Sequence, residues 1–193
     1  MDVIDRFEIK RVICNGDIKH HTKRIKIQEL EELKYFTEHI TEKQVMLEFI
    51  QGNHDHLLEF IFPHIDMDYL TLHEAIILDE ILIHHGHLDP PPGDYSTILL
   101  SHEHPSFVFN GYNKARVKLP AFVTLQAAGK FVIILPAASS ISLGTSFPLS
   151  STSQFLSHFL KTNGDLRSME IFPTDGELGL LELPPVRQWR SKR

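Results

Sequence analysis

The chain of 193 residues contains a single cysteine and no long apolar run. One thiol, Cys14, excludes an internal disulfide framework and a zinc site built from thiolates, so metal binding would have to use His, Asp, Glu or Asn. The apolar runs, such as residues 131–135, are far shorter than the roughly 20 residues that a membrane helix needs. Nothing at the start resembles a signal peptide. We therefore expect a cytoplasmic protein with no membrane partner.

Positive charge is also scarce. The formal net charge of −6 argues against a broad surface for binding polyanions, and only the tail at residues 187–193 is notably basic. The balance of 42% hydrophobic and 23% charged residues is typical of a globular protein, and no repeat or low-complexity tract is visible. The length suits one large domain, so we expect a single domain over residues 1–193.

Histidine is the residue in excess. The chain has 13 histidines, and all but His158 lie between His20 and His104. Any chemistry that depends on histidine is therefore expected in the first part of the chain.

The order of patterns in this part predicts an α/β fold. Residues 10–14 form a short β-rich run that stops at Asn-Gly-Asp, residues 28–40 place their apolar side chains on one helical stripe, and residues 44–50 indicate a buried strand. A strand, a helix and a strand in this order are typical of a parallel β-α-β unit. Both strands end in polar clusters, at the edge where open α/β sheets collect their ligand sites.

Further strands follow along the chain. Residues 75–78 and 80–87 indicate a hairpin, and residues 96–105 another strand that ends in histidines. The second half, after residue 105, is expected to be mainly β, with a flexible loop at 139–153.

Four polar clusters thus follow short apolar runs. They contain the candidate ligands Asp17, Asn53, His85, His102 and His104, with His54 and Asp55 beside Asn53. Carboxylate, amide and imidazole ligands suit Mn²⁺, Fe, Zn²⁺, Co²⁺ or Ni²⁺, and a shared carboxylate can hold two ions roughly 3.5 to 4 Å apart. This ligand set is typical of two-metal phosphoryl chemistry.

The neutral members of the clusters fit an anionic substrate. Every carboxylate ligand reduces the positive charge of the metals, whereas Asn53 and neutral histidines preserve it for a phosphate. His54 could then act as an acid that protonates the leaving oxygen. Asp55 could hold the other ring nitrogen of His54 and raise its pKa.

Taken together, "GDxxH", "GNHD", "HG" and "HxH" in this order resemble the calcineurin-like metallophosphoesterases, over roughly residues 10–135. The resemblance is strongest to small prokaryotic phosphoesterases related to the branch of double-strand-break repair nucleases. It implies a four-layer α/β/β/α sandwich that lacks its first strand. It also implies two divalent ions, Mn first among those named above, and hydrolysis by attack of a metal-bridging hydroxide.

The resemblance also implies a role for each motif residue. Asp17 resembles the bridging carboxylate and His54 the catalytic acid, while the remaining ligands divide between the second metal (Asn53, His85 and His102) and the first (His104). His20 matches a histidine of the nuclease branch, which favours a phosphodiester, with nucleic acid or a nucleotide as the phosphate-ester partner.

Some positions stay open. His84 could be the ligand in place of His85, although a histidine directly before glycine fits the family better. His87 could touch substrate or support a ligand. Ser101 stands where the family normally has glycine, and because serine is small we expect this difference to cost little.

The Asp-x-His strand that opens the family pattern is missing before Asp17. The first metal would keep Asp17 and His104, with His20 as additional help. We expect that Met1 is an internal or misassigned start. The rival hypothesis is a catalytically impaired paralogue with a structural or partner-binding role. The pattern identifies neither the natural substrate nor the oligomeric state.

Overall fold

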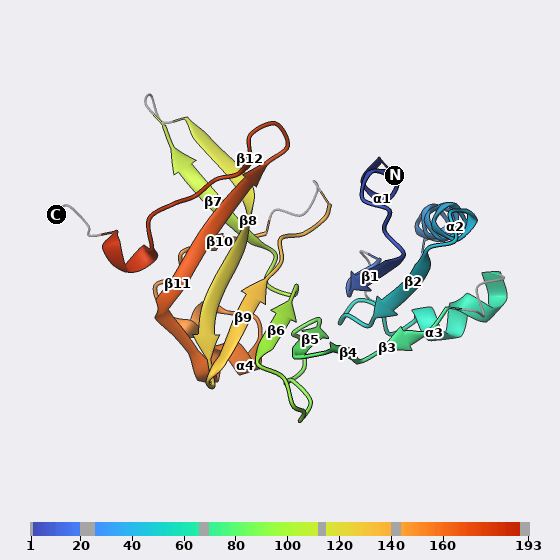
Figure 1. Ribbon diagram of the computed structural model, residues 1–193, viewed down its shortest axis with the longest axis horizontal. Helices are drawn as coiled ribbons and strands as arrows, with labels where there is room; N and C mark the ends of the chain where they lie inside the picture. The colour runs from blue at the N-terminus through green and yellow to red at the C-terminus, as the bar shows by residue number, and fades with distance from the viewer. Residues whose placement is uncertain (1, 20–25, 66–69, 112–114, 140–143, 190–193) are drawn as a thin grey trace. The chain divides into compact units, whose positions relative to one another are not determined.

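The computed structural model describes residues 2–19, 26–65, 70–111, 115–139 and 144–189. The chain divides into two compact units, residues 1–76 and residues 77–193. Both contain helices and strands (Figure 1), which confirms the mixed α/β class. A single domain over the whole chain stays a prediction, and residues 190–193 of the basic tail lie outside the described residues.

The first unit is built around a small parallel sheet with the strand order β1-β2-β3. Its elements are α1 (Asp2–Arg6), β1 (Arg11–Asn15), α2 (Ile27–Glu42), β2 (Met46–Ile50), α3 (Leu58–Ile61), the 3-10 helix η1 (Phe62–Ile65) and β3 (Leu72–His73). The parallel pairing of β1 with β2 around α2 confirms the predicted β-α-β unit. Because Asn15 pairs with Ile50, the loops that follow β1 and β2 leave the sheet at the same edge.

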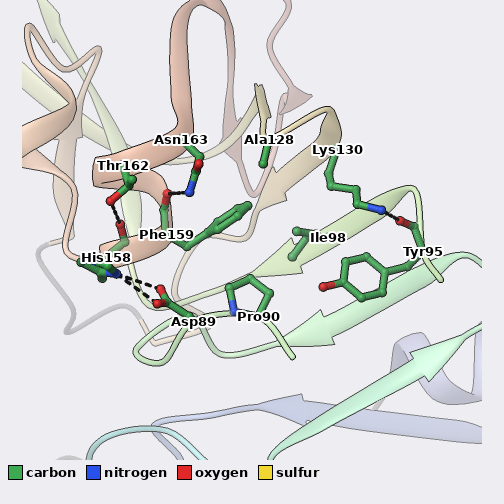
Figure 2. Close-up of a pocket in the computed structure, with 10 residues that line it drawn as sticks. All are labelled: Asp89, Pro90, Tyr95, Ile98, Ala128, Lys130, His158, Phe159, Thr162 and Asn163. Atoms are coloured by element: carbon green, nitrogen blue, oxygen red, sulfur yellow. Dashed lines mark hydrogen bonds and ion pairs between the residues drawn. The ribbon is translucent and has the colours of Figure 1, made fainter. Parts of the chain in front are cut away.

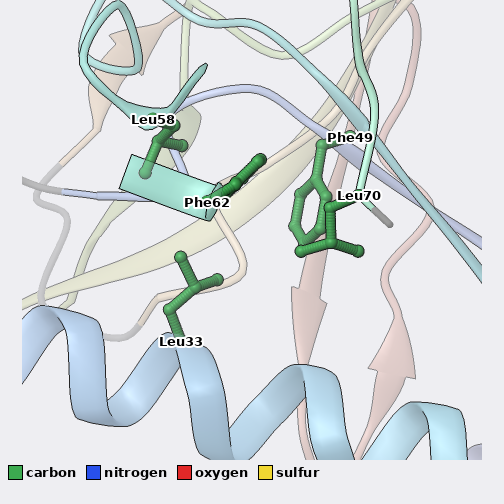
Figure 3. Packing of buried hydrophobic residues seen from close by; sticks show 5 residues of the cluster. All are labelled: Leu33, Phe49, Leu58, Phe62 and Leu70. Atoms are coloured by element: carbon green, nitrogen blue, oxygen red, sulfur yellow. The ribbon is translucent and has the colours of Figure 1, made fainter. Parts of the chain in front are cut away.

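The core of this unit lies where α2, β2 and α3 meet (Figure 3). Leu33 projects from α2, and the rings of Phe49 and Phe62 lie 6.0 Å apart. Leu58 and Leu70 complete the cluster. Helix α2 buries Leu33, Thr37 and Ile40, at the spacing of three to four residues expected for one face of an amphipathic helix. This packing holds β2 in place and so positions the loop that follows it.

The second unit is dominated by a mixed sheet with the order β10-β7-β8-β9-β6-β5-β4, and β11 pairs with both β8 and β12. The strands are β4 (Ala75–Leu78), at which the chain passes from one unit to the next, β5 (Ile81–His84), β6 (Thr97–Leu100), β7 (Pro105–Asn110), β8 (Arg116–Ala127), β9 (Lys130–Ile134), β10 (Thr145–Phe147), β11 (Gly164–Asp175) and β12 (Gly179–Leu180). The helices are η3 (Thr152–Gln154), α4 (His158–Asn163) and η4 (Val186–Gln188). The long strands β8 and β11 run side by side (Figure 1) and are antiparallel.

Strands β5, β6 and β9 are parallel to one another. Their inward residues Leu82, Ile98 and Val132 are almost completely buried. Ile83 pairs with Leu99, so the segments after β5 and β6 also leave their sheet at a common edge. No helix in the described part of the chain is long and apolar enough to cross a membrane.

The flexible loop expected at residues 139–153 is only partly a loop. Residues 140–143 lie outside the described residues, but β10 and the start of η3 fall within the range. Strand β10 pairs with β7 over three residues. Such a short strand depends on its tertiary partner, so local sequence carries little signal for it.

Candidate metal centre

The loop after β1 turns sharply to present Asp17. Gly16 and Asp17 have φ angles of 80° and 52°, a left-handed conformation that glycine adopts freely and aspartate tolerates. The Asp17 side chain is half-buried. His20, the predicted residue three positions further on, lies outside the described residues.

The loop after β2 lies directly against Asp17. A Cβ atom at Gly52 would come within 2.3 Å of both the backbone nitrogen and the Oδ1 atom of Asp17, so only glycine fits there. The backbone N–H of His54 donates to Asp17 Oδ1 at 3.1 Å. Two of the predicted clusters are therefore joined within the first unit.

Asp55 ties the two loops together. Its Oδ1 accepts from the backbone N–H groups of Ile18 and Lys19 at 3.0 and 3.3 Å, and its Oδ2 accepts from Gly52 N–H at 2.9 Å. Burial raises the pKa of this carboxyl and the nearby Asp17 raises it too, whereas the backbone donors act in the opposite direction. The orienting role expected for Asp55 toward the His54 ring stays a prediction. The structure shows that the Asp55 carboxylate holds the backbone of the two loops through these hydrogen bonds.

The neighbouring side chains differ in exposure. Asn53 is exposed and His54 is half-buried, whereas Asp55 is completely buried. The amide and the imidazole can therefore meet a ligand in solution, while the carboxylate is committed to the fold. His56, next in sequence, is exposed.

In the second unit, the backbone carbonyl of His85, after β5, accepts hydrogen bonds from two residues that follow β6. The backbone N–H groups of Ser101 and His102 both donate to the His85 carbonyl, at 3.0 and 2.9 Å. Gly86 has a φ of 109°, and a Cβ there would lie 3.4 Å from His102 Cβ. The glycine thus permits the turn that brings His85 and His102 together.

Four imidazoles gather at this edge. The His85 ring lies 5.0 Å from His102 and 5.3 Å from His87, measured between ring centroids. His84 instead stacks on His87 at 6.4 Å. Of the two adjacent histidines, His85 thus has its ring next to that of His102, and which of them would bind a metal stays a prediction.

Burial favours the neutral form of the His84 imidazole. His85 is completely buried and His84 is 2% exposed. Burial, followed by the neighbouring His87 and His85, lowers the pKa of His84 to about 4. A neutral ring has the lone pair that metal binding requires.

His104 belongs to the same turn. Its backbone N–H donates to the Ser101 carbonyl at 3.0 Å, and its φ of 43° is unusual for a residue other than glycine. Glu103, between the two histidines, is completely buried and accepts from the backbone N–H groups of Leu156 and Ser157 at 2.7 to 2.9 Å. Burial raises the pKa of Glu103 despite these donors.

Two contributors to this region were missed from the sequence. Ser101 Oγ lies 3.0 Å from His85 Nδ1, and the Glu103 carboxylate anchors the turn that bears His102 and His104. An acid between two histidines at a strand end was a visible signal for Glu103. No sequence pattern indicates the Ser101 contact, because it depends on the turn geometry.

The second unit also contains a hollow of about 440 Å³ (Figure 2), and none of the predicted ligands lines it. Ile98, Pro90 and Phe159 line it, with an exposed pair of His158 Nδ1 and Asp89 at 3.0 Å. The Lys130 ammonium lies 4.8 Å from the centre of the Tyr95 ring and bonds the Tyr95 carbonyl. Its charged groups are thus engaged with one another or with the backbone.

Comparisons with protein-family models, with curated proteins and with solved structures found no match to this chain.

Proposed function

We propose that this protein is a metal-dependent phosphoesterase of the calcineurin-like type, with the four-layer α/β/β/α sandwich of that type as its fold. One observation carries the proposal. In each unit, two polar loops that follow parallel strands are joined by hydrogen bonds, Asp17 to the His54 backbone in the first and His85 to His102 in the second. Chance clusters of histidine would not be expected to pair in this way in both units.

We further propose that Asp17, His85 and His102 are metal ligands, and that Asn53 and His104 complete the ligand set for two divalent ions. Each of the first three offers one ligand atom, a carboxylate oxygen or an imidazole nitrogen. This mixture of hard and borderline donors fits Mn²⁺, Fe, Zn²⁺, Co²⁺ or Ni²⁺. When bound, such ions polarise a phosphate oxygen and acidify a water molecule.

His54 is the proposed acid for the leaving oxygen. Its backbone is held by Asp17, while its half-buried ring can reach a substrate. A proton delivered by a positioned imidazole typically contributes 10²- to 10⁴-fold to a rate. A phosphodiester, either a nucleotide or nucleic acid, is the proposed substrate class, on the basis of His20.

The direct test is hydrolysis of a chromogenic phosphodiester with added Mn²⁺, together with elemental analysis. We expect His54→Ala to lose about 10²-fold or more in kcat while it keeps its metal. His85→Ala should lose metal and activity together. His56→Ala is the matched control, since it removes an exposed imidazole two residues from His54.

The outcomes separate the two hypotheses. Two ions per chain and turnover that depends on His54 would support the phosphoesterase. Bound metal without turnover would favour the impaired paralogue, and the absence of both would overturn the proposal. Cleavage of DNA that is lost in His20→Ala would identify the substrate as nucleic acid.

A further inference from the structure

Ser101 contacts His85 twice. Its backbone N–H donates to the His85 carbonyl at 3.0 Å, and its Oγ lies 3.0 Å from His85 Nδ1. His85 is completely buried. A single residue therefore holds both the backbone and the ring of a proposed metal ligand.

This contact distinguishes the two ring nitrogens of His85. A metal ion at Nδ1 would have to displace the Ser101 hydroxyl, so Nε2, whose lone pair points in a different direction, is the nitrogen suited to a metal. A neutral imidazole carries hydrogen on one nitrogen and a lone pair on the other. Nε2 can bind a metal only if Nδ1 carries the hydrogen, and the hydroxyl must then accept it.

A different serine, Ser106, shows that a buried serine hydroxyl in this fold does not have to contact a histidine ring. Ser106 is 4% exposed, and its hydroxyl donates to the Thr145 carbonyl at 2.9 Å. A backbone carbonyl thus satisfies that hydroxyl without involving a ring. The family that the motifs resemble normally has glycine at the position of Ser101. Because glycine has no hydroxyl, the contact with His85 Nδ1 depends on the serine of this chain.

We propose that Ser101 is a positioning residue for His85: its hydroxyl accepts a hydrogen bond from Nδ1–H, fixes the ring and its tautomer, and presents Nε2 to a divalent metal ion. The metal rests on the proposed function, whereas the tautomer is a property of the chain itself. The two can therefore fail separately.

The first measurement reads the tautomer in the full chain without added metal. Two-bond ¹H–¹⁵N spectra of protein labelled with ¹⁵N-histidine report which ring nitrogen carries hydrogen, and His85→Gln identifies the His85 signals. We expect the Nδ1–H form in the wild type and in Ser101→Thr, which keeps the hydroxyl. In Ser101→Ala the other tautomer should become populated, while Ser106→Ala should leave the His85 signals unchanged.

The second measurement is the affinity for Mn²⁺ by titration calorimetry. Loss of a partner that orients a metal-binding histidine typically costs 10- to 100-fold in metal affinity, which we expect for Ser101→Ala but not for Ser106→Ala. Ser101→Thr should recover most of the affinity.

An Nε2–H tautomer of His85 in the wild type would overturn the proposal. An unchanged tautomer in Ser101→Ala, or unchanged Mn²⁺ affinity in that variant, would overturn it as well. If the wild type binds no Mn²⁺, the metal part fails with the proposed function, and the tautomer spectra alone decide whether Ser101 sets the His85 ring.

Discussion

In each unit, hydrogen bonds join two polar loops that follow parallel strands, but the accepting groups differ between the units. In the first unit the loops after β1 and β2 meet through a carboxylate, Asp17, that accepts a backbone N–H. In the second unit the loops after β5 and β6 meet through a carbonyl, and imidazoles gather around it. As candidate metal ligands, the first unit therefore offers mainly oxygen atoms and the second mainly imidazole nitrogen atoms.

Each unit also commits one buried carboxylate to its backbone. Asp55 accepts from three N–H groups and Glu103 from two. Both acids are completely buried, and burial raises the pKa of each. An acid in a ligand-rich motif can therefore serve the fold, so the motif alone does not reveal which acids bind a ligand.

The largest expected effect comes from removing these carboxylates. Asp55→Ala leaves three backbone N–H groups without their acceptor and should lower the free energy of unfolding by about 4 kcal/mol. Glu103→Ala leaves two and should cost about 3 kcal/mol. Urea unfolding measures both losses, with Asp89→Ala, an exposed acid, as the control that should change stability by less than about 0.5 kcal/mol. Equal, small losses in all three variants would refute the role of Asp55 and Glu103 in holding the backbone.

A somewhat smaller effect is expected from adding a methyl group at the strand-end glycines. Gly52→Ala should cost about 3 kcal/mol, because its Cβ would overlap the backbone of Asp17. Gly86→Ala should cost about 2 kcal/mol, mainly from its positive φ. Gly176→Ala, whose Cβ would meet nothing within 4 Å, is the control for thermal unfolding. A tolerated Gly52→Ala would contradict the close approach of the two loops.

The smallest effect on stability at neutral pH is expected from Cys14, the single thiol of the chain, which lies in the first unit. Burial, with a contribution from Asp55, raises the pKa of Cys14 to about 11. Because unfolded chains bind fewer protons at this site between pH 9 and 11, its contribution to stability should fall as pH rises through that window. At pH 8 we expect alkylation of the native thiol to be about 100-fold slower than in urea. Equal rates would show that the thiol is accessible.

Cys14 and Trp189 allow the units to be followed separately. Trp189 is the single tryptophan; it belongs to the second unit, where its ring lies 5.5 Å from Phe107. In urea, thiol reactivity therefore reports the first unit and tryptophan fluorescence the second. We expect Asp55→Ala to shift the Cys14 transition and Glu103→Ala the Trp189 transition. If both variants moved both transitions equally, the units would unfold as one body.

The sequence predicted those parts of the fold that depend on local periodicity. Strand β1, helix α2 and strand β2 were each expected from apolar spacing, and the structure contains all three with parallel strands. Strand β10 and the short helix α4 were not expected, because three or six residues carry too little pattern without their tertiary partners. Division into two units was not visible either, since no linker composition marks residue 76.

In the candidate site, too, local sequence pattern predicted some features and tertiary contacts determined the others. The position of Asp17 and His54 at strand ends followed from the order of strands and turns, and so did that of His85 and His102. The contacts of Asp55, Ser101 and Glu103 could not be predicted, because each depends on which backbone group lies within about 3 Å. The sequence therefore indicated that these residues follow strands, and the structure shows which backbone and side-chain groups contact them.

The central claim is that the polar loops at the strand ends supply metal ligands. The Mn²⁺ affinity of Asp17→Ala and of His102→Ala, measured by titration calorimetry, tests it most directly, with His56→Ala, which removes an exposed imidazole, as the control. If Asp17 and His102 are ligands, each of their variants should lose most of the affinity while His56→Ala keeps it. Mn²⁺ binding in Asp17→Ala or His102→Ala that equals that of the wild type would contradict the claim.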